Sequence, residues 1–317
     1  MALLGRTANG LFWMHRYIER AENMARLIDA GLRISLTNLS AGPEEWHSVL
    51  TSAGVEAGYR AKYAVFEPSS IIDFLLRDPD NPSSVVSSID TARMNGRMVR
   101  TALTREVWEA LNEGWIHLKR RLGRPVSETE LPGVLDLVKR QTAYVRGAFH
   151  GTMLRNEIFD FANLGTFIER ADNTARILDV KYWVLLPKHS SIGSPLDHFQ
   201  WISILRSVSA HRAYTWEYGA DFRAPDIIDF LVLNRRMPRS LAYSYGMIEE
   251  SLGYLARTYG VEHECHQIAR ARTAQFSRCQ SINDIIEGGL HEFLESFIIE
   301  TNGLANEIAR NYSFYPV

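Results

Sequence analysis

Two short Glu-Arg segments contain the residues of this chain that are best suited to do chemistry. The first reads YIERAENMARLID over residues 17–29, and the second reads FIERADNTARILD over residues 167–179, with eight of 13 positions identical. An arginine in such a set can hold a carboxylate or phosphate through two hydrogen bonds, while a glutamate acts as a base or binds an amine. The candidate site residues, to which no catalytic role is assigned, are Glu19, Arg20, Asn23, Arg26, Glu169, Arg170, Asn173 and Arg176.

The charged residues of each segment recur at helical spacing. Arg20 and Asn23 fall on a different side of the helix from the main polar stripe. On a solvated helix such pairs contribute only a few tenths of a kcal/mol each. An exposed Glu-Arg pair would not need to be the same in both segments, so we favour a buried ion-pair network around a pseudo-twofold axis, which would fix geometry more than add stability. The stripe consists of Glu19, Glu22, Arg26 and Asp29 in the first segment, and of Glu169, Asp172, Arg176 and Asp179 in the second.

Other arrangements of reactive residues are weak in this chain. Helical bundles that bind two metal ions use a Glu-x-x-His spacing, and no histidine follows Glu19 or Glu169 by three residues, so neither a metal nor a cofactor is predicted. His263, Cys265 and His266 lie close together, but a lone cluster is poor evidence for zinc. We expect a helix or loop surface there with a half-buried cysteine, and its role stays open.

Nucleophile and phosphate-binding motifs are also missing from the sequence. There is no glycine-rich phosphate loop, no G-x-S-x-G elbow and no Cys-His signature, which argues against a stand-alone enzyme. Residues 93–124 form the most basic region, but they offer no stacking platform and no recognised nucleic-acid-binding fold. We interpret that region as a solvated face or a docking surface for an acidic partner, and nucleic-acid binding is not expected.

Helical periodicity dominates the elements that must position these residues. A serine at 69 or 70 can cap a short helix over IIDFLLR, and Pro225 can open its counterpart. Pro82 and Pro238 are placed to begin longer helices near 83–104 and 239–259, and Pro132 a helix that ends near Leu154. No convincing set of alternating strands is found, so the predicted class is all-α. The apolar face of the first segment consists of Met14, Tyr17, Ile18, Ala21, Ala25, Ile28 and Leu32, with alanines that allow close helix approach.

Matching segments extend well beyond the two Glu-Arg stretches. WHSVL at 46–50 corresponds to WISIL at 201–205, and IIDFLL at 71–76 corresponds to IIDFLV at 227–232. Pro82 and Pro238 are separated by the same number of residues as the two IIDFL segments. These matches predict two tandem pseudo-repeats of about 155 residues, 1–150 and 151–317, within a single helical domain that spans 1–317. The segment PKHSSIGSP, beginning at residue 187, is the clearest linker in the chain.

The pattern also predicts how the ends of the chain meet. Residues 133–153 precede the second Glu-Arg segment, and their counterpart by pattern is the C-terminal stretch 282–302. If the repeats are equivalent, the C-terminal helix packs against the N-terminal helix and closes the bundle.

Size and composition are those of a globular protein. The chain has 317 residues, 46% of them hydrophobic, with a formal net charge of −2 and two cysteines, which fits a reducing compartment. Its N-terminus lacks the features of a secretory signal, and no stretch approaches the roughly 18 apolar residues of a membrane span. A cytoplasmic location is therefore expected.

The two Glu-Arg segments, together with the opening RTANGLFWMHRYIERAEN and the lead-in FANLGTFIERAD, resemble the Alpha-E family over essentially the entire chain. That family is a bacterial all-helical domain of unknown biochemical function named for its ER motif. The resemblance places the motif on Glu19 and Arg20, and again on Glu169 and Arg170. One departure is that Phe159 and Phe161 stand where a tryptophan-led lead-in is expected.

The resemblance also implies partners. Members of the family are typically encoded beside, or fused to, a circularly permuted ATP-grasp protein, often with a transglutaminase-like cysteine peptidase nearby. ATP-grasp enzymes activate carboxylates as acyl phosphates and join them to amines. The chain would then be an accessory subunit that docks the ligase or presents its substrate, or an enzyme that acts on a peptide or amide intermediate. Buried, mutually satisfied Glu-Arg pairs would favour the accessory subunit, and pairs that line an accessible pocket would favour the enzyme.

Overall fold

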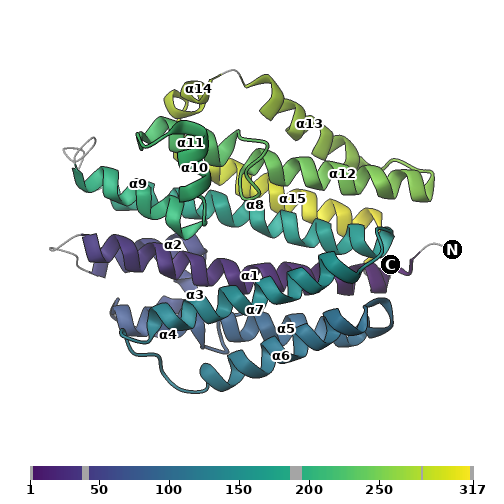
Figure 1. The fold of residues 1–317 in the computed structure, drawn as a ribbon, viewed down its shortest axis with the longest axis horizontal. Helices are drawn as coiled ribbons and strands as arrows, with labels where there is room; N and C mark the ends of the chain where they lie inside the picture. Colours follow the sequence, from purple (N-terminus) through teal and green to yellow (C-terminus); the bar gives the residue numbers. More distant parts are fainter. Residues whose placement is uncertain (1–2, 38–42, 186–194, 280, 315–317) are drawn as a thin grey trace.

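The computed structural model describes residues 3–37, 43–185, 195–279 and 281–314, and this part of the chain is helical without strands, which confirms the predicted all-α class (Figure 1). The first group of helices is α1 Gly5–Thr37, α2 Pro43–Ala53, α3 Glu56–Arg60, α4 Pro68–Leu76, α5 Val85–Met98, α6 Arg105–Arg121 and α7 Leu131–Thr152. The second group is α8 Glu157–Leu185, α9 Pro195–Ser207, α10 His211–Tyr218, α11 Ala224–Val232, α12 Leu241–Tyr259, α13 Glu264–Arg278, α14 Ile282–Glu287 and α15 Leu290–Asn311.

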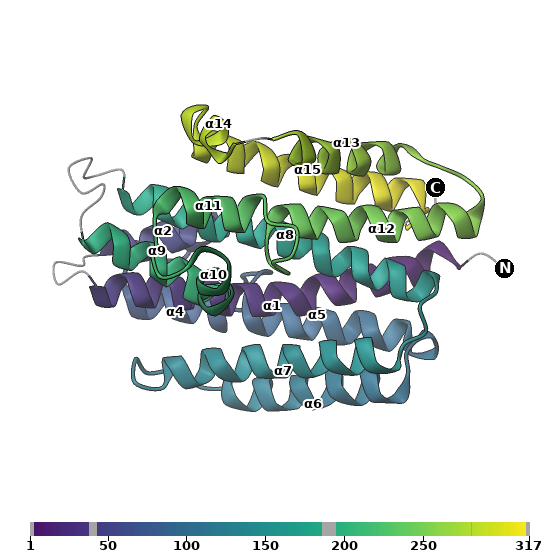
Figure 2. The same ribbon diagram turned by 45° about the horizontal axis from the view of Figure 1, so that its top comes forward.

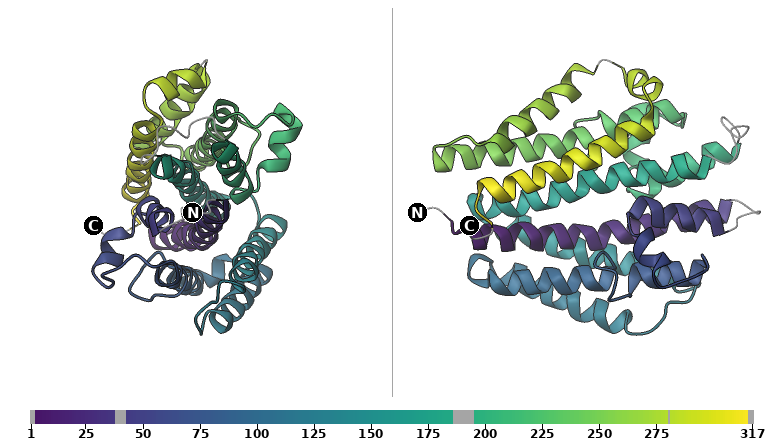
Figure 3. Two further views of the ribbon diagram at one scale, coloured as in Figure 1. Left: turned by 90° about the vertical axis from the view of Figure 1, so that its left-hand side faces the viewer. Right: turned by 180° about the vertical axis from the view of Figure 1, so that it is seen from behind.

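The two long helices that carry the Glu-Arg segments, α1 and α8, run parallel through the middle of the molecule (Figures 1 and 3). Their backbones touch in the N-terminal part of both helices, because Gly165 has no side chain. A Cβ built on Gly165 would lie 2.1 Å from the carbonyl oxygen of Phe12. The alanines of both segments, including Ala21 and Ala171, are fully buried. The two helices therefore approach closely at Gly165, whereas an approach along their alanine faces stays a prediction.

Each central helix belongs to its own group of four long helices (Figure 2). Helices α5 and α7 pack on α1, and α6 covers both of them. Helices α12 and α15 pack on α8, and α13 covers both of these. The short helices α2 and α9 lie near one end and each contacts both α1 and α8. The contact between α1 and α8 is thus shared by both groups, although the duplication itself stays a prediction.

The beginnings of several helices differ from the predictions. Helix α4 begins at Pro68, and no side-chain cap hydrogen bond is made at its N-terminus, so the predicted serine cap is wrong. Pro68 supplies the backbone angle that a first helical residue needs. Pro225 is the second helical residue of α11. The predicted helix 83–104 begins only after Ser84, whose hydroxyl accepts a hydrogen bond from the Ser87 amide.

Helix ends show two further corrections. Helix α5 stops at Met98 and is followed by a single 3₁₀ turn, Arg100–Ala102, because Thr104 already caps the next helix, α6. The C-terminal stretch is two helices instead of one, because Gly289 adopts a φ of +99° between α14 and α15. Only glycine takes up that conformation readily. The predicted helices near 239–259 and from Pro132 to Leu154 agree with α12 and α7 to within two residues.

The predicted contact between the C-terminal and N-terminal helices is present at particular points. Asn302 of α15 accepts a hydrogen bond from Arg16 of α1 at 3.2 Å, and Phe314 packs on Phe12 with ring centroids 5.4 Å apart. Most of the length of α15 lies along α8, and α7 lies along α1. Each of these helices therefore covers the central helix of its own group. The predicted linker PKHSSIGSP lies outside the described residues up to its final proline. Within the described ranges, no helix is long and apolar enough to cross a membrane.

Candidate functional site

The two Glu-Arg pairs meet across the contact between α1 and α8, and each glutamate binds the arginine of the other helix. Arg170 donates to the Glu19 carboxylate from Nε at 2.8 Å and from Nη2 at 3.0 Å. Arg20 donates to Glu169 from Nε at 2.6 Å and from Nη2 at 2.9 Å. Both contacts are bidentate, the strongest geometry available to an Arg-carboxylate pair. The predicted ion-pair network between the two segments is confirmed as a contact.

On one side of this contact lies a set of ion pairs that we call the closed cluster. Besides Arg170, Glu19 accepts hydrogen bonds from Arg239 at 3.1 Å and Arg146 at 3.3 Å. Arg239 also donates to the neighbouring carboxylate of Glu22. Both carboxylates are buried, with at most 1% of either residue exposed. The closed cluster consists of Glu19, Glu22, Arg26, Arg146, Arg170 and Arg239.

Glu19, Glu22 and Arg239 of the closed cluster are ionised at neutral pH. Burial raises the pKa of Glu19, but Arg170 and Arg239 outweigh it and bring that pKa down to about 2. The same opposition holds the pKa of Glu22 well below its usual range. Burial lowers the pKa of Arg239 to about 9 against the attraction of Glu22, which leaves the guanidinium protonated at pH 7. These three groups therefore belong to a structural ion-pair network, and none of them is ready to exchange a proton near pH 7.

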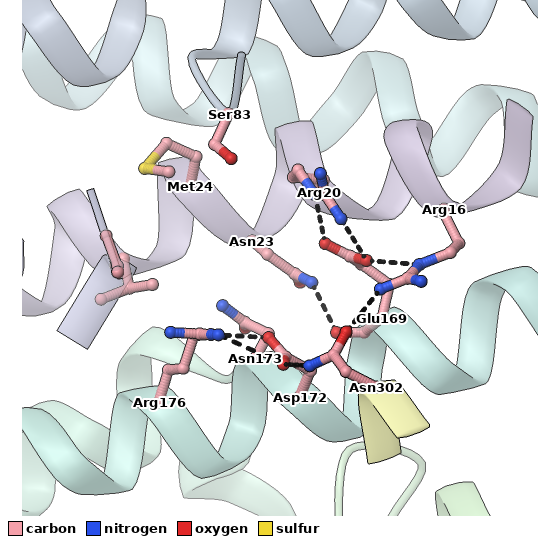
Figure 4. A pocket seen from close by; sticks show the side chains of 13 residues that line it. Arg16, Arg20, Asn23, Met24, Ser83, Glu169, Asp172, Asn173, Arg176 and Asn302 are labelled. Carbon is pink, nitrogen blue, oxygen red and sulfur yellow. Dashed lines mark hydrogen bonds and ion pairs between the residues drawn. The ribbon is translucent and has the colours of Figure 1, made fainter. Parts of the chain in front are cut away.

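On the other side of the contact the corresponding residues surround a cavity of about 210 Å³ (Figure 4). There Glu169 binds Arg20 and also Arg16, whose Nε lies 2.9 Å from the carboxylate. Asp172 binds Arg176 at 2.6 Å and accepts a hydrogen bond from an asparagine of α15 at 2.8 Å. One water needs roughly 10–15 Å³ of such space, so the cavity has room for a larger group. We call this set the open cluster: Arg16, Arg20, Asn23, Glu169, Asp172, Asn173, Arg176 and Asn302.

Two asparagines of the open cluster have unused acceptors. Asn23 and Asn173 line the cavity and are each 3% exposed. The Oδ1 atom of each is buried and accepts no hydrogen bond from any described residue. The amide of Asn23 is oriented by its Nδ2, which donates to the Glu169 carbonyl oxygen at 3.1 Å. Both oxygens are buried acceptors without a partner among the described residues, and their burial keeps them from contact with a group inside the cavity.

A further arginine on each central helix binds the C-terminal end of a short helix. Arg26 donates to the carbonyl oxygen of Ser207, the last residue of α9, at 2.7 Å. Arg176 donates to the carbonyl oxygen of Ser52, at the end of α2, at 2.9 Å. Carbonyl groups at a helix C-terminus lack partners within the helix and attract cations. These contacts fix the short helices that flank the two clusters.

The structure thus separates the eight predicted residues into two sets. Glu19, Arg26 and Arg170 belong to the closed cluster, and the remaining five line the cavity. Four important residues were missed by sequence reasoning because they lie outside the Glu-Arg segments: Arg16 of α1, Arg146 of α7, Arg239 before α12 and Asn302 of α15. One feature of the sequence does distinguish Arg239. It follows Pro238, whereas the matching segment has a serine after Pro82.

The histidine-cysteine cluster is mainly structural. Cys265 is fully buried, so the prediction of a half-buried cysteine is wrong. His266 accepts a hydrogen bond from the backbone amide of His263 at 2.9 Å, and the two side chains form a capping box at the start of α13. Helix capping of this kind satisfies amides that have no partner within the helix. No group of three metal-ligating side chains is found in the part of the chain that the structure describes.

His15, beside the two clusters, should make the stability of the fold depend on pH. Burial is the largest of the causes that lower its pKa, from 6.5 to about 3. Between these values the unfolded chain binds a proton that the folded chain does not, so the contribution of His15 weakens as pH falls, by up to about 1.4 kcal/mol per pH unit. Denaturant unfolding at several pH values from 3.5 to 7.5 should therefore show a flatter profile for His15→Leu than for the unmodified chain.

The His15→Leu variant must be compared with the unmodified chain because Asp160 has the opposite effect on the pH dependence of stability. Burial raises the pKa of Asp160 from 3.8 to about 7, so its contribution to stability falls as pH rises through that range. The difference between the two profiles cancels Asp160 and isolates His15. Parallel profiles would contradict the assignment of His15 as a neutral buried group.

The described residues form an all-helical protein whose two central helices carry reciprocal Glu-Arg pairs. The sequence profile of Alpha-E, described as a predicted alpha-helical domain with a conserved ER motif, matches residues 3–313. Because this match covers nearly the whole chain, the chain belongs to the Alpha-E family. No solved structure matches it significantly.

Curated relatives have been found in mycobacteria. The chain is 22% identical to an uncharacterised protein of Mycobacterium bovis over 325 residues, which cover 96% of this chain and 36% of that relative. An uncharacterised protein of Mycobacterium tuberculosis gives the same identity and the same coverage. The chain therefore spans about a third of the length of the curated relatives it matches, and in them the matched region is joined to further polypeptide.

Proposed function

We propose that the chain is an accessory subunit of an ATP-grasp-linked peptide or amide ligation system, in which it holds part of the substrate in the open cavity. The observation that carries this proposal is the difference between the two clusters. The Glu19–Arg170 pair is enclosed and satisfied, while the Arg20–Glu169 pair forms the wall of a polar cavity. One pair is thus part of the framework, and the other is placed to contact a ligand.

The chemistry of the cavity favours binding over catalysis. Burial raises the pKa of Glu169, but Arg20 and Arg16 outweigh it and bring that pKa down to about 2. A carboxylate of such low basicity is a poor general base near neutral pH, because an effective base has a pKa near the working pH. Among the described residues, the lining includes no histidine, cysteine or lysine, and Ser83 supplies its one hydroxyl. The alternative hypothesis of an enzyme acting on a peptide or amide intermediate is therefore less well supported by this site.

The size of the cavity fits a role in presentation. Sites that enclose a whole drug-sized ligand usually measure about 300–1,000 Å³, and this cavity measures about 210 Å³. It would hold one end of a substrate and leave the rest outside. The ligase would come from the partners that the family resemblance implies, a circularly permuted ATP-grasp protein with, in some systems, a transglutaminase-like peptidase. The additional polypeptide of the mycobacterial relatives supports a function carried out together with another module.

Affinity capture of the tagged chain from its native cells, with ATP and magnesium present, tests this proposal. We expect to recover an ATP-grasp protein, identified by mass spectrometry, that an unrelated tagged helical protein does not capture. Amide formation by the recovered complex, followed as ADP release, should fall at least tenfold with Arg20→Ala while the partner is still bound, because Arg20 lines the cavity.

Two results would count against the proposal. Failure to recover an ATP-grasp protein would oppose the accessory role. A complex whose amide formation is unchanged by Arg20→Ala would show that the cavity does not present the substrate.

A further inference from the structure

We propose that the open cavity binds a carboxylate group of the ligand, held by the guanidinium groups of Arg20 and Arg176. The inference rests on the proposed function in taking the cavity as the ligand site, and it adds the chemical class of the group recognised there. The substrate would be a compound with a free carboxylate.

The first step is which charged groups of the lining a ligand can reach. The Arg20 side chain is 22% exposed and the Arg176 side chain is 25% exposed, whereas the side chains of their carboxylate partners, Glu169 and Asp172, are 6% and 11% exposed. The two arginines line the cavity from different central helices, Arg20 from α1 and Arg176 from α8 (Figure 4). The charged surface that the cavity offers to a ligand is therefore mainly cationic.

The second step is the hydrogen-bonding capacity that is left at the cavity. Both carboxylate oxygens of Glu169 accept hydrogen bonds from arginines, and both oxygens of Asp172 bind Arg176. A guanidinium has five N–H donors, and Arg20 donates to Glu169 only from Nε and Nη2. Its Nη1 donates no hydrogen bond within the described residues. The acceptors are thus occupied while donors remain, which is the arrangement that an anion requires.

The third step is the repulsion between the two arginines. Burial lowers the pKa of Arg176, and the Asp172 carboxylate outweighs it, so that the pKa is raised overall. The positive charge of Arg20 opposes this rise, which means that the two guanidinium groups are close enough to repel each other. A carboxylate bound between them would replace this repulsion by attraction to both, through charge-assisted hydrogen bonds.

The start of α5 adds to the positive potential. Ser83 lines the cavity two residues before α5 begins at Val85, and its hydroxyl is directed toward the other lining side chains (Figure 4). The N-terminus of a helix carries a partial positive charge and favours anions. In the closed cluster, the residue directly before the capping serine of α12 is Arg239, which binds two glutamates. The much shorter serine leaves the corresponding space open.

The net charge of the lining favours a carboxylate over a phosphate. The cavity is lined by three arginines and two carboxylates, a net of one positive charge, which a single carboxylate neutralises. A phosphate monoester carries about 1.5 to 2 negative charges at pH 7, so it would leave an excess of negative charge in a largely enclosed site. Such uncompensated charge is costly to bury.

The closed cluster carries a larger positive charge, but a ligand cannot reach it. It contains four arginines and two glutamates. Arg26, Arg170 and Arg239 are buried, and the first two also donate to backbone carbonyl oxygens. We therefore expect the carboxylate in the open cluster only.

Titration of the isolated chain with acetate tests the inference without any ligase. We expect saturable shifts in the NMR signals of the side-chain Nε–H groups of Arg20 and Arg176. At matched ionic strength, inorganic phosphate should bind more weakly than acetate, and methylguanidinium should give no saturable shift. Saturation by methylguanidinium and not by acetate would overturn the inference, as would tighter binding of phosphate than of acetate. Absence of saturation by acetate would overturn it as well.

A matched pair of variants tests the position of the bound acetate. Ser83→Asp introduces a carboxylate at the cavity, and Ser83→Asn introduces a neutral side chain of the same shape. Acetate should bind at least tenfold more weakly to Ser83→Asp than to Ser83→Asn, because the new carboxylate competes for the two arginines. Equal binding to the two folded variants would place the acetate elsewhere and overturn the assignment.

The comparison of the three probes on the unmodified chain holds even if a Ser83 variant does not fold. Because no partner protein is involved, a negative result in this titration is distinct from failure to capture an ATP-grasp protein.

Discussion

Replacing Glu19 with glutamine should lower the free energy of unfolding by about 3–5 kcal/mol. Glu19 is 1% exposed and accepts hydrogen bonds from Arg170, Arg239 and Arg146. Glutamine keeps the shape of the side chain but removes its charge, so these guanidinium groups lose one of the two carboxylates that compensate them. Losing one partner of a buried ion pair usually costs that much because a buried charge is left uncompensated. Urea unfolding followed by circular dichroism measures the change.

An exposed pair provides the matched control. Arg105 and Glu109 form an ion pair four residues apart on the surface of α6, and Glu109→Gln should leave the unfolding midpoint within experimental error, since exposed pairs contribute little. A loss of less than 1 kcal/mol with Glu19→Gln would contradict the account of the closed cluster as part of the framework of the fold.

Replacing Gly165 with alanine should cost about 3 kcal/mol or more. The added Cβ would lie 2.1 Å from the carbonyl oxygen of Phe12, which is backbone and cannot turn aside. Inserting a single carbon into a well-packed core commonly costs about 1–3 kcal/mol. The upper end is expected here because separating α1 from α8 also stretches the Glu-Arg pairs between them. The measurement is again the free energy of unfolding.

Gly147 on the exposed side of α7 serves as the control for this change. An added Cβ there meets no atom within 4 Å, so Gly147→Ala should stabilise the protein by about 0.5–1 kcal/mol through the better helix propensity of alanine. Equal effects of the two substitutions would show that the close backbone approach at Gly165 does not determine the packing of the central helices.

Local patterns predicted the fold because most of its elements are specified by neighbouring residues. Apolar positions at helical spacing indicated the long helices, and prolines and serines marked several helix starts. The Glu-Arg segments stood out because they occur twice, and this placed the functional candidates on two helices that do meet. Errors arose where tertiary context decides, as at Gly289, whose positive φ divides the predicted C-terminal helix.

The site itself could be predicted only in part. Sequence reasoning placed Glu19 and Glu169 in one kind of environment because their segments match. The structure gives them different surroundings, since Arg146 lies on α7 and Arg239 directly before α12, and neither belongs to a Glu-Arg segment. Whether a pair is enclosed or lines a cavity depends on such distant side chains, and their positions follow from packing that no local pattern specifies.

The most direct test of the central claim is a crystal structure of the complex captured from native cells with ATP and magnesium. Part of the substrate should lie in the open cluster beside Arg20 and Glu169, and no ligand should reach the closed cluster, where Arg239 already contacts Glu19 and Glu22. An open cavity that stays free of substrate, or one that is filled by a side chain of the protein itself, would contradict the claim that one Glu-Arg pair belongs to the framework and the other to a ligand site.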